Sequence, residues 1–299
     1  ADVTAGNDVK MNVNTGDITI GADVTAGNDV DLDVNTGDIT IGADVTAGND
    51  VKMNVNTGDI TVGVNVTTDA GSDGKGNVVA KNGDVTVAVS GEGIVGIVKS
   101  VTAQEGSIDI QVGTGGVTIG NNGPGVETVT AYKNIDVAVD LGRIEIYGKT
   151  STKTGDISMS AAESEYVPGG QNIIIAQNGE LDSGRDAKLT GRNGDLHVTD
   201  AVKAVRNLDA KVLEEGDIIY DKTVKVNGDV TAKTDKGSIS VTKEVTANRV
   251  VLDTRKGNIS VSGDIRSNTD VTMHTGSGDI TAKNVNAQGG DIFGRNISP

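Results

Sequence analysis

A 21-residue segment is repeated three times in tandem at the start of the chain, and this repeat restricts the fold more than any other feature. The first copy, ADVTAGNDVKMNVNTGDITIG, spans residues 1–21, and two copies with few changes follow at 22–42 and 43–63. Self-similarity at a fixed short period is typical of proteins that stack one structural unit on the next. The repeat therefore predicts a solenoid.

Each copy contains three short apolar clusters separated by residues that favour tight turns. In the first copy, Val9, Met11 and Val13 alternate with polar residues, and Ile18 and Ile20 do the same. This period of two is that of a half-buried strand, with the apolar side chains on one face. Clusters rich in Gly, Asn and Asp divide the strands. We expect these five residues and their equivalents in later copies to point into the core.

The predicted fold class is all-β, a right-handed parallel β-helix of about 12 rungs, each with roughly 21 residues and three strands. A rung is one circuit of the coil, and stacked rungs lie about 4.8 Å apart. The right hand follows the usual preference of parallel crossovers. A leucine-rich repeat would need a leucine ladder and a helical return. A left-handed hexapeptide helix would need an apolar residue every six positions, whereas the spacing here is six, then nine.

The same spacings continue after the identical copies end, so a single β-helix is expected over residues 1–299, with diverged rungs over 64–299. Three loop insertions interrupt the register, at 68–75, 90–98 and 161–170. The first is expected to loop outward, and the second is apolar enough to fold back on the coil. Insertions in solenoids often carry binding residues, although they can also be neutral decoration. The candidate binding residues in them are Asp69, Asp73, Glu92, Glu163, Glu165 and Tyr166.

Composition excludes several other classes of protein. Aromatic residues make up 2% of the chain, which cannot fill a large globular core but suits a narrow coil. The net charge is −16, and residues 1–63 contribute −9 of it, so binding to nucleic acid or to anionic membranes is not expected. No apolar run could span a bilayer, no signal peptide is visible, and cysteine is absent. Neither end carries a capping element, so we expect the chain to continue into further rungs of a longer parent protein.

One outward position alternates in charge along the three copies. Lys10, Asp31 and Lys52 occupy the same place in successive repeats. Stacking predicts an ion-pair ladder with one carboxylate between two ammonium groups. This feature sets the order of the rungs and suggests no catalysis.

The acidic residue before each third strand also recurs, at Asp17, Asp38 and Asp59. Carboxylates at this spacing repel one another unless backbone N–H groups or a cation neutralise them. Hydrogen bonds from N–H groups at the corners are the simpler prediction. A calcium ladder is the alternative, but the tandem calcium-binding nonapeptide is not present, so we expect no cofactor and no metal.

Asn14, Asn35 and Asn56 recur at another corner and predict an amide ladder along the coil. This ladder is expected to be structural.

Catalysis finds little support, so the chain is not expected to be an enzyme. The two histidines, His197 and His274, lie far apart in the sequence and at outward positions. A polysaccharide-active enzyme remains an alternative, because four charged residues could cluster by stacking: Arg185, Asp186, Arg192 and Asp195.

Strands such as GDITI and VTA, in rungs of about 20 residues, resemble the filamentous haemagglutinin family of secreted bacterial exoproteins. The resemblance is carried by GDITIGADVTAGNDVDLDVNTGDITIG (16–42), NGDVTAKTDKGSISVTKEVTANRVVLDTRKGNISVSGDI (227–265) and TGSGDITAKNVNAQGGDI (275–292). It implies a β-helical shaft of an adhesin at the bacterial surface or secreted from the cell, with a host-cell protein or glycan as partner. A purely mechanical spacer or filament is the alternative, since the shaft of this family has no defined ligand motif.

Overall fold

The computed structural model describes the chain in five segments: 1–63, 75–120, 127–163, 171–175 and 179–296. These segments belong to two compact units, Ala1–Gly155 and Asp156–Pro299.

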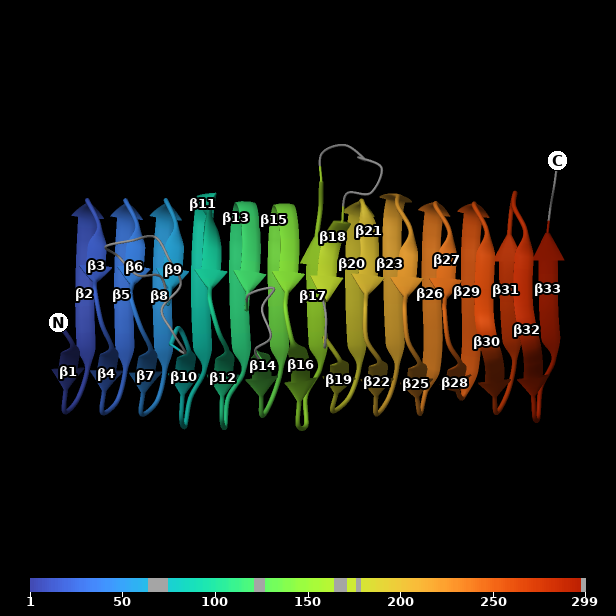
Figure 1. Cartoon of the computed structure of the whole chain (residues 1–299), viewed down its shortest axis with the longest axis horizontal. Helices are drawn as coiled ribbons and strands as arrows, with labels where there is room; N and C mark the ends of the chain where they lie inside the picture. Colours follow the sequence, from blue (N-terminus) through green and yellow to red (C-terminus); the bar gives the residue numbers. More distant parts are fainter. Residues whose placement is uncertain (64–74, 121–126, 164–170, 176–178, 297–299) are drawn as a thin grey trace. The chain divides into compact units, whose positions relative to one another are not determined.

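Every regular element in the described segments is a β-strand, and within each unit the strands pair in parallel with equivalent strands of neighbouring rungs. The strands stack in about 12 rungs of about 21 residues. In Figure 1, equivalent strands of successive rungs lie side by side within each unit. The prediction of a parallel β-solenoid is therefore confirmed.

The first unit contains strands β1 to β16. Their bounds are β1 Val3–Ala5, β2 Val9–Thr15, β3 Ile18–Ile20, β4 Val24–Ala26, β5 Val30–Thr36, β6 Ile39–Ile41, β7 Val45–Ala47, β8 Val51–Thr57, β9 Ile60–Val62, β10 Val78–Ala80, β11 Val85–Ile97, β12 Val101–Ala103, β13 Ile108–Ile119, β14 Thr128–Ala131, β15 Ile135–Ile146 and β16 Lys149–Thr152.

The second unit contains strands β17 to β33. Their bounds are β17 Ile157–Ala161, β18 Gln171–Ile175, β19 Leu181–Ser183, β20 Ala187–Asn193, β21 Asp195–Val198, β22 Val202–Ala204, β23 Leu208–Glu215, β24 Ile218–Tyr220, β25 Val224–Val226, β26 Asp229–Lys236, β27 Ile239–Val241, β28 Val245–Ala247, β29 Arg249–Lys256, β30 Ile259–Ser267, β31 Val271–Thr275, β32 Ile280–Ala287 and β33 Ile292–Asn296.

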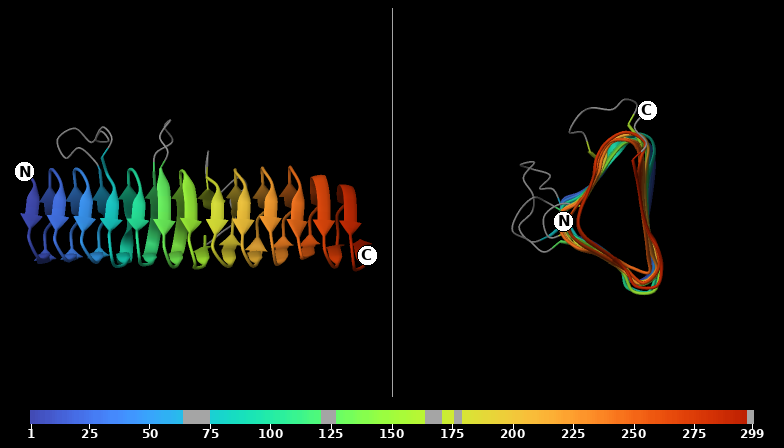
Figure 2. Two further views of the ribbon diagram at one scale, coloured as in Figure 1. Left: turned by 90° about the horizontal axis from the view of Figure 1, so that it is seen from below. Right: turned by 90° about the vertical axis from the view of Figure 1, so that its right-hand side faces the viewer.

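Each rung has three sides that meet at three corners, as the end-on view in Figure 2 shows. In the identical copies the three sides are a short strand, a longer strand and a second short strand, for example β4, β5 and β6. The register joins equivalent residues of neighbouring copies, so Val9 pairs with Val30 and Ile18 with Ile39. Outward residues of one position therefore form columns along the coil.

Apolar side chains from all three sides fill the inside of the coil. Leu32, Ile39 and Met53 are fully buried, as their equivalents are in most rungs. In the first rung, Met11 and Val13 are half-buried, because only one neighbouring rung in this chain covers them. The predicted inward register is confirmed.

Glycine occupies one corner of nearly every rung because the backbone there has no room for a side chain. Gly37 has a φ of 132°, and a Cβ atom on it would lie 2.2 Å from the carbonyl oxygen of Gly16. In the second unit, Gly237 repeats this arrangement over Gly216. Both the positive φ and the contact between rungs require glycine.

The acidic columns are neutralised by backbone N–H groups, as predicted. The N–H of Asp38 donates to Oδ1 of Asp17 (2.9 Å), and the N–H of Asp59 donates to Oδ1 of Asp38 (2.9 Å). The donor belongs to the next rung, so each carboxylate also joins two rungs.

The predicted ion-pair ladder forms in part. The Nζ of Lys52 lies 3.9 Å from Asp31, but that of Lys10 lies 3.6 Å from Asp8 in its own rung. The amide ladder is confirmed, since Nδ2 of Asn35 donates to Asn14 (3.4 Å) and Nδ2 of Asn56 donates to Asn35 (3.3 Å).

The prediction of a loop at 90–98 was wrong. Residues 85–97 form the single strand β11, which continues through the corner and pairs with β13 on one side and with β8 and β9 on the other. An irregularity in the register between Val89 and Glu92 absorbs the extra residue. Small residues at Gly91 and Gly93 allow the backbone to stay extended there, so the segment extends the rung and does not leave it. The long strands β13 and β15 repeat this arrangement, and their rungs have two strands where three were predicted.

Candidate functional site

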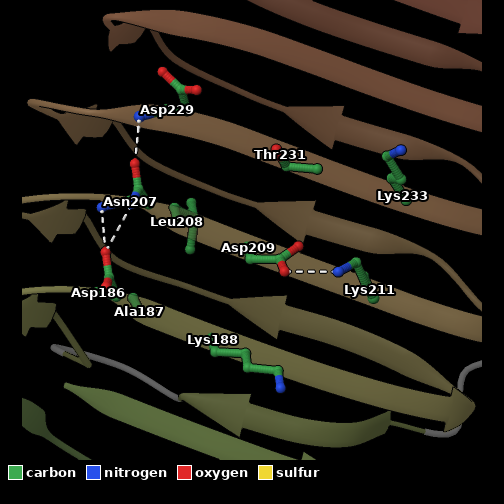
Figure 3. Close-up of a pocket in the computed structure, with 10 residues that line it drawn as sticks. All are labelled: Asp186, Ala187, Lys188, Asn207, Leu208, Asp209, Lys211, Asp229, Thr231 and Lys233. Atoms are coloured by element: carbon green, nitrogen blue, oxygen red, sulfur yellow. Dashed lines mark hydrogen bonds and ion pairs between the residues drawn. The ribbon is translucent and has the colours of Figure 1, made fainter.

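A shallow groove of about 510 Å³ lies over the outward side of β20, β23 and β26 in the second unit. Figure 3 shows the side chains along it. We call it the ionic groove, because three lysines and three aspartates line it. Its lining residues are Asp186, Ala187, Lys188, Asn207, Leu208, Asp209, Lys211, Asp229, Thr231 and Lys233.

One edge of the ionic groove is a hydrogen-bonded column at the corner before the long strands. Oδ1 of Asp186 accepts from both the backbone N–H and Nδ2 of Asn207, each at 2.9 Å. Oδ1 of Asn207 in turn accepts from the N–H of Asp229 at 2.9 Å (Figure 3). Arg206 approaches the other oxygen of Asp186 at 3.2 Å. As in the acidic columns of the first unit, a side-chain oxygen at this corner accepts a backbone N–H of the next rung.

The floor of the ionic groove places charged side chains in register on neighbouring strands. Lys188 pairs with Asp209, and Lys211 pairs with Lys233. Nζ of Lys211 donates to Oδ2 of Asp209 at 2.7 Å, so the ammonium turns along its own strand (Figure 3). Nζ of Lys233 lies 3.9 Å from Asp253. Two like charges in register are therefore each compensated by a carboxylate.

A second groove of about 320 Å³ adjoins the first and shares Lys211 and Lys233 with it. Here Arg255 holds Asp235 through both of its carboxylate oxygens. The hydrogen bond from Arg255 lowers the pKa of Asp235 and raises that of the guanidinium. Nδ1 of His274 contacts Oδ1 of Asp253 at 2.8 Å.

The charged side chains of this surface neutralise one another. The aspartates on its floor pair with cations, and those on its edge accept backbone or amide N–H groups. A neighbouring ammonium or N–H donors make a carboxylate a weaker general base. Oδ1 of Asp209 is the exception to the pairing, since it is buried and accepts no hydrogen bond among the described residues. The arrangement suits contact by hydrogen bonds and charge more than it suits catalysis.

The sequence-predicted binding residues fall in different places. Asp69, Asp73, Glu165 and Tyr166 lie outside the described residues. Glu92 lies on β11 with an exposed side chain, and its carbonyl oxygen accepts from the N–H of Gly58 at 3.1 Å.

Glu163 belongs to the second unit, where its carbonyl oxygen accepts from Nδ2 of Asn193 at 3.1 Å. Within the described residues of each unit, the structure brings none of these predicted side chains into a common site.

The charged cluster considered for catalysis separates into independent contacts. Arg185 lies 3.6 Å from Asp156, and Arg192 lies 3.9 Å from Glu214. Asp195 is buried, its Oδ1 accepts from the N–H of Asp217 at 2.8 Å, and burial raises its pKa.

Both histidines occupy outward positions, as predicted. Nε2 of His197 lies 2.8 Å from Oδ2 of Asp221, and His274 makes the contact with Asp253 described above.

The described part of the chain contains no group of three or more His, Asp or Glu residues arranged to hold a metal ion. It also contains no long apolar helix of the kind that crosses a membrane.

Comparison with known proteins gave no match to any family model, to any curated protein or to any solved structure.

Proposed function

We propose that this chain is a shaft segment of a large, secreted or surface-exposed bacterial adhesin, with a structural role along the coil and contact with host cells or glycans through its outward surfaces. The observation that carries the proposal is the continuity of the ladders within each unit. Equivalent strands of successive rungs pair in parallel, and the core residues of most rungs are buried. Such a coil gains its stability from neighbouring rungs alone, which suits an element that must be long rather than compact.

Surface chemistry supports a structural role in the same way. Lysines and aspartates of the ionic groove compensate one another, and corner carboxylates hold the N–H groups of the next rung. The resemblance to the filamentous haemagglutinin family adds the bacterial surface and the adhesive role to the proposal.

Mechanical pulling on the full chain, tethered at its two ends, tests the structural part of the proposal. A shaft made of stacked rungs should unravel in a series of similar steps, each releasing roughly 70 Å of extended chain for about 21 residues. A single rupture that releases each unit at once would contradict it.

Beads coated with the full chain and applied to cultured epithelial cells test the adhesive part. We expect retention on the cells, and its reduction when residues 68–75 or 161–170 are replaced by short Gly-Ser linkers. Retention no greater than that of uncoated beads would favour the purely mechanical spacer over the adhesin.

A further inference from the structure

The outward side of β2, β5 and β8 in the first unit carries polar side chains in two parallel columns, which we call the amide face. One column lies two residues further along each strand than the other. Members of the column nearer the start of each strand are in register from rung to rung, and members of the other column are joined by hydrogen bonds. A groove of about 380 Å³ runs between the columns. The amide face consists of Asn12, Asn14, Asp33, Asn35, Asn54 and Asn56.

Hydrogen bonds along the columns orient most of these side chains. In one column, Asn35 and Asn56 each donate an Nδ2 hydrogen to the amide of the preceding rung, and Ser90 continues the ladder by donating to Asn56 (2.9 Å). In the other column, Nδ2 of Asn54 donates to Asp33 at 2.6 Å. The side chains are thus oriented before any ligand arrives, which lowers the entropy lost on binding.

Each amide in the ladder retains hydrogen-bonding capacity. A carboxamide has two N–H donors and two acceptor lone pairs, and the ladder uses one of each at Asn35. The exposed side chains of Asn35 and Asn56 therefore present a donor beside an acceptor once per rung. Adjacent hydroxyl groups of a sugar ring match this pair, because each hydroxyl can both donate and accept.

Charge narrows the choice of ligand. Of the described residues that line the groove, one, Asp33, is charged. Its carboxylate accepts from Asn54 and lies 4.0 Å from Nζ of Lys52. The surrounding three copies carry a net charge of −9, which repels sulfated or carboxylated chains. A groove lined mainly by uncharged amides in an acidic surface suits a neutral partner.

We propose that the amide face is a binding surface for a neutral polysaccharide chain, held by bidentate amide–hydroxyl hydrogen bonds repeated from rung to rung. None of the described residues that line the groove is aromatic, so each rung contributes a weak contact without ring stacking. Affinity then comes from the number of rungs engaged at once. This inference rests on the proposed contact with glycans and names their class, and it can fail while the structural part of the proposed function stands.

Native gel electrophoresis of the full chain through gels containing soluble polysaccharide tests the inference. The probes are three neutral polysaccharides (dextran, a mannan and a galactan), with dextran sulfate as the charged counterpart of the first. We expect retardation by at least one neutral polysaccharide and none by dextran sulfate. Simultaneous Asn14→Ala, Asn35→Ala and Asn56→Ala substitution should weaken the apparent affinity at least about tenfold.

The matched control changes three hydroxyls on another side of the same rungs, Thr19→Ala, Thr40→Ala and Thr61→Ala, and should leave retardation unchanged. Far-ultraviolet circular dichroism of both triple variants checks that the coil is intact. Retardation that persists in the folded asparagine variant, or no retardation of the wild-type chain by any neutral polysaccharide, would overturn the inference. So would sedimentation that shows self-association lost in the asparagine variant, because the amide face would then bind a second copy. None of these results bears on stepwise unravelling under force.

Discussion

The carboxylate of Asp38 accepts a hydrogen bond of 2.9 Å from the backbone N–H of Asp59, the residue at the same position one rung later. The same relationship joins Asp17 to Asp38, and Asp59 accepts from the N–H of Ile94 at 2.8 Å. A column of like charges is tolerated because each carboxylate faces an N–H dipole of the next rung. At the equivalent positions of the second unit, Ser238 and Asn258 accept in the same way, so the position requires an oxygen acceptor and not a charge.

Substitution of Asp38 tests this requirement. Asp38→Ala leaves the N–H of Asp59 without its acceptor and should lower the free energy of unfolding by about 1 kcal/mol. Asp38→Asn keeps an oxygen acceptor and removes a like charge from the column, so its effect should be much smaller. Urea unfolding of the three chains measures the difference, and equal losses in both variants would assign the effect to charge.

An acidic side chain in the core provides a test of the inward register. Ile39 is fully buried on β6, and Ile39→Asp would place an unpaired charge among aliphatic side chains. We expect a loss of about 3 kcal/mol or more in the free energy of unfolding. Thr40→Asp, at the next and outward position, is the control and should change stability by less than about 0.5 kcal/mol. Similar effects of the two changes would contradict the register.

Glycine at the corner should be indispensable. A Cβ atom at Gly58, where φ is 131°, would lie 2.2 Å from the carbonyl oxygen of Gly37. Gly58→Ala should therefore cost about 2 kcal/mol or more. At Gly96, in strand β11, the nearest atom to such a Cβ is 3.9 Å away, so Gly96→Ala should be close to neutral or stabilising. Thermal unfolding of both variants compares them, and equal melting temperatures would contradict the crowded corner.

The hydroxyl of Tyr220 is buried in the core of the second unit and has no hydrogen-bond partner among the described residues. Tyr220→Phe removes this unpaired group and should leave the free energy of unfolding at pH 7 unchanged or raise it by about 1 kcal/mol. Tyr132→Phe, at an exposed ring, is the control and should have little effect. A clear loss of stability in Tyr220→Phe would show that the hydroxyl is satisfied.

The pH dependence of the free energy of unfolding at alkaline pH provides a second test of Tyr220. Burial, and to a lesser extent the charge of Asp209, raises the pKa of Tyr220 above its ordinary value of 10.0. The unfolded chain then releases this proton near pH 10 while the folded chain retains it, so the stability of the wild-type chain falls as pH rises above about 10. Tyr220→Phe lacks this contribution, and its unfolding free energy should fall less steeply in the same range. Parallel curves for the two chains would contradict the raised pKa.

Much of the coil could be predicted from the sequence, because inward positions obey a strict period that chemistry enforces. Val9, Leu32 and Ile39 must face the core in any register that buries them together. The segment from Ser90 to Val98 was predicted wrongly because the period alone does not show where a strand ends. Its alternation was visible, but only the tertiary context shows that an extended corner with a bulge can absorb the extra residue.

Ion pairs between outward side chains were harder to predict, because a long charged side chain has several possible partners at similar distances. Lys10 turns to Asp8 although its register partner is Asp31. Of the residues that line the ionic groove, the sequence analysis singled out Asp186 alone, although the signal for the lysines is in the sequence. Lys211 and Lys233 occupy the same outward position of successive rungs. The apolar clusters define the register of these rungs, and reading the outward residues in that register would have placed the two lysines side by side.

Deletion of residues 22–42 from the full chain tests the central claim, that rungs are interchangeable units of a shaft, most directly. This deletion removes one whole rung and brings Lys10 into register with Lys52, a repulsion worth a few tenths of a kcal/mol. Urea-induced unfolding followed by circular dichroism should give a cooperative transition with a midpoint close to that of the wild-type chain, because each rung contacts only its neighbours. Deletion of residues 22–32 removes half a rung and should lower the midpoint markedly, because it breaks the ladders on both sides. Loss of cooperative unfolding after removal of the whole rung, or equal tolerance of both deletions, would contradict the claim.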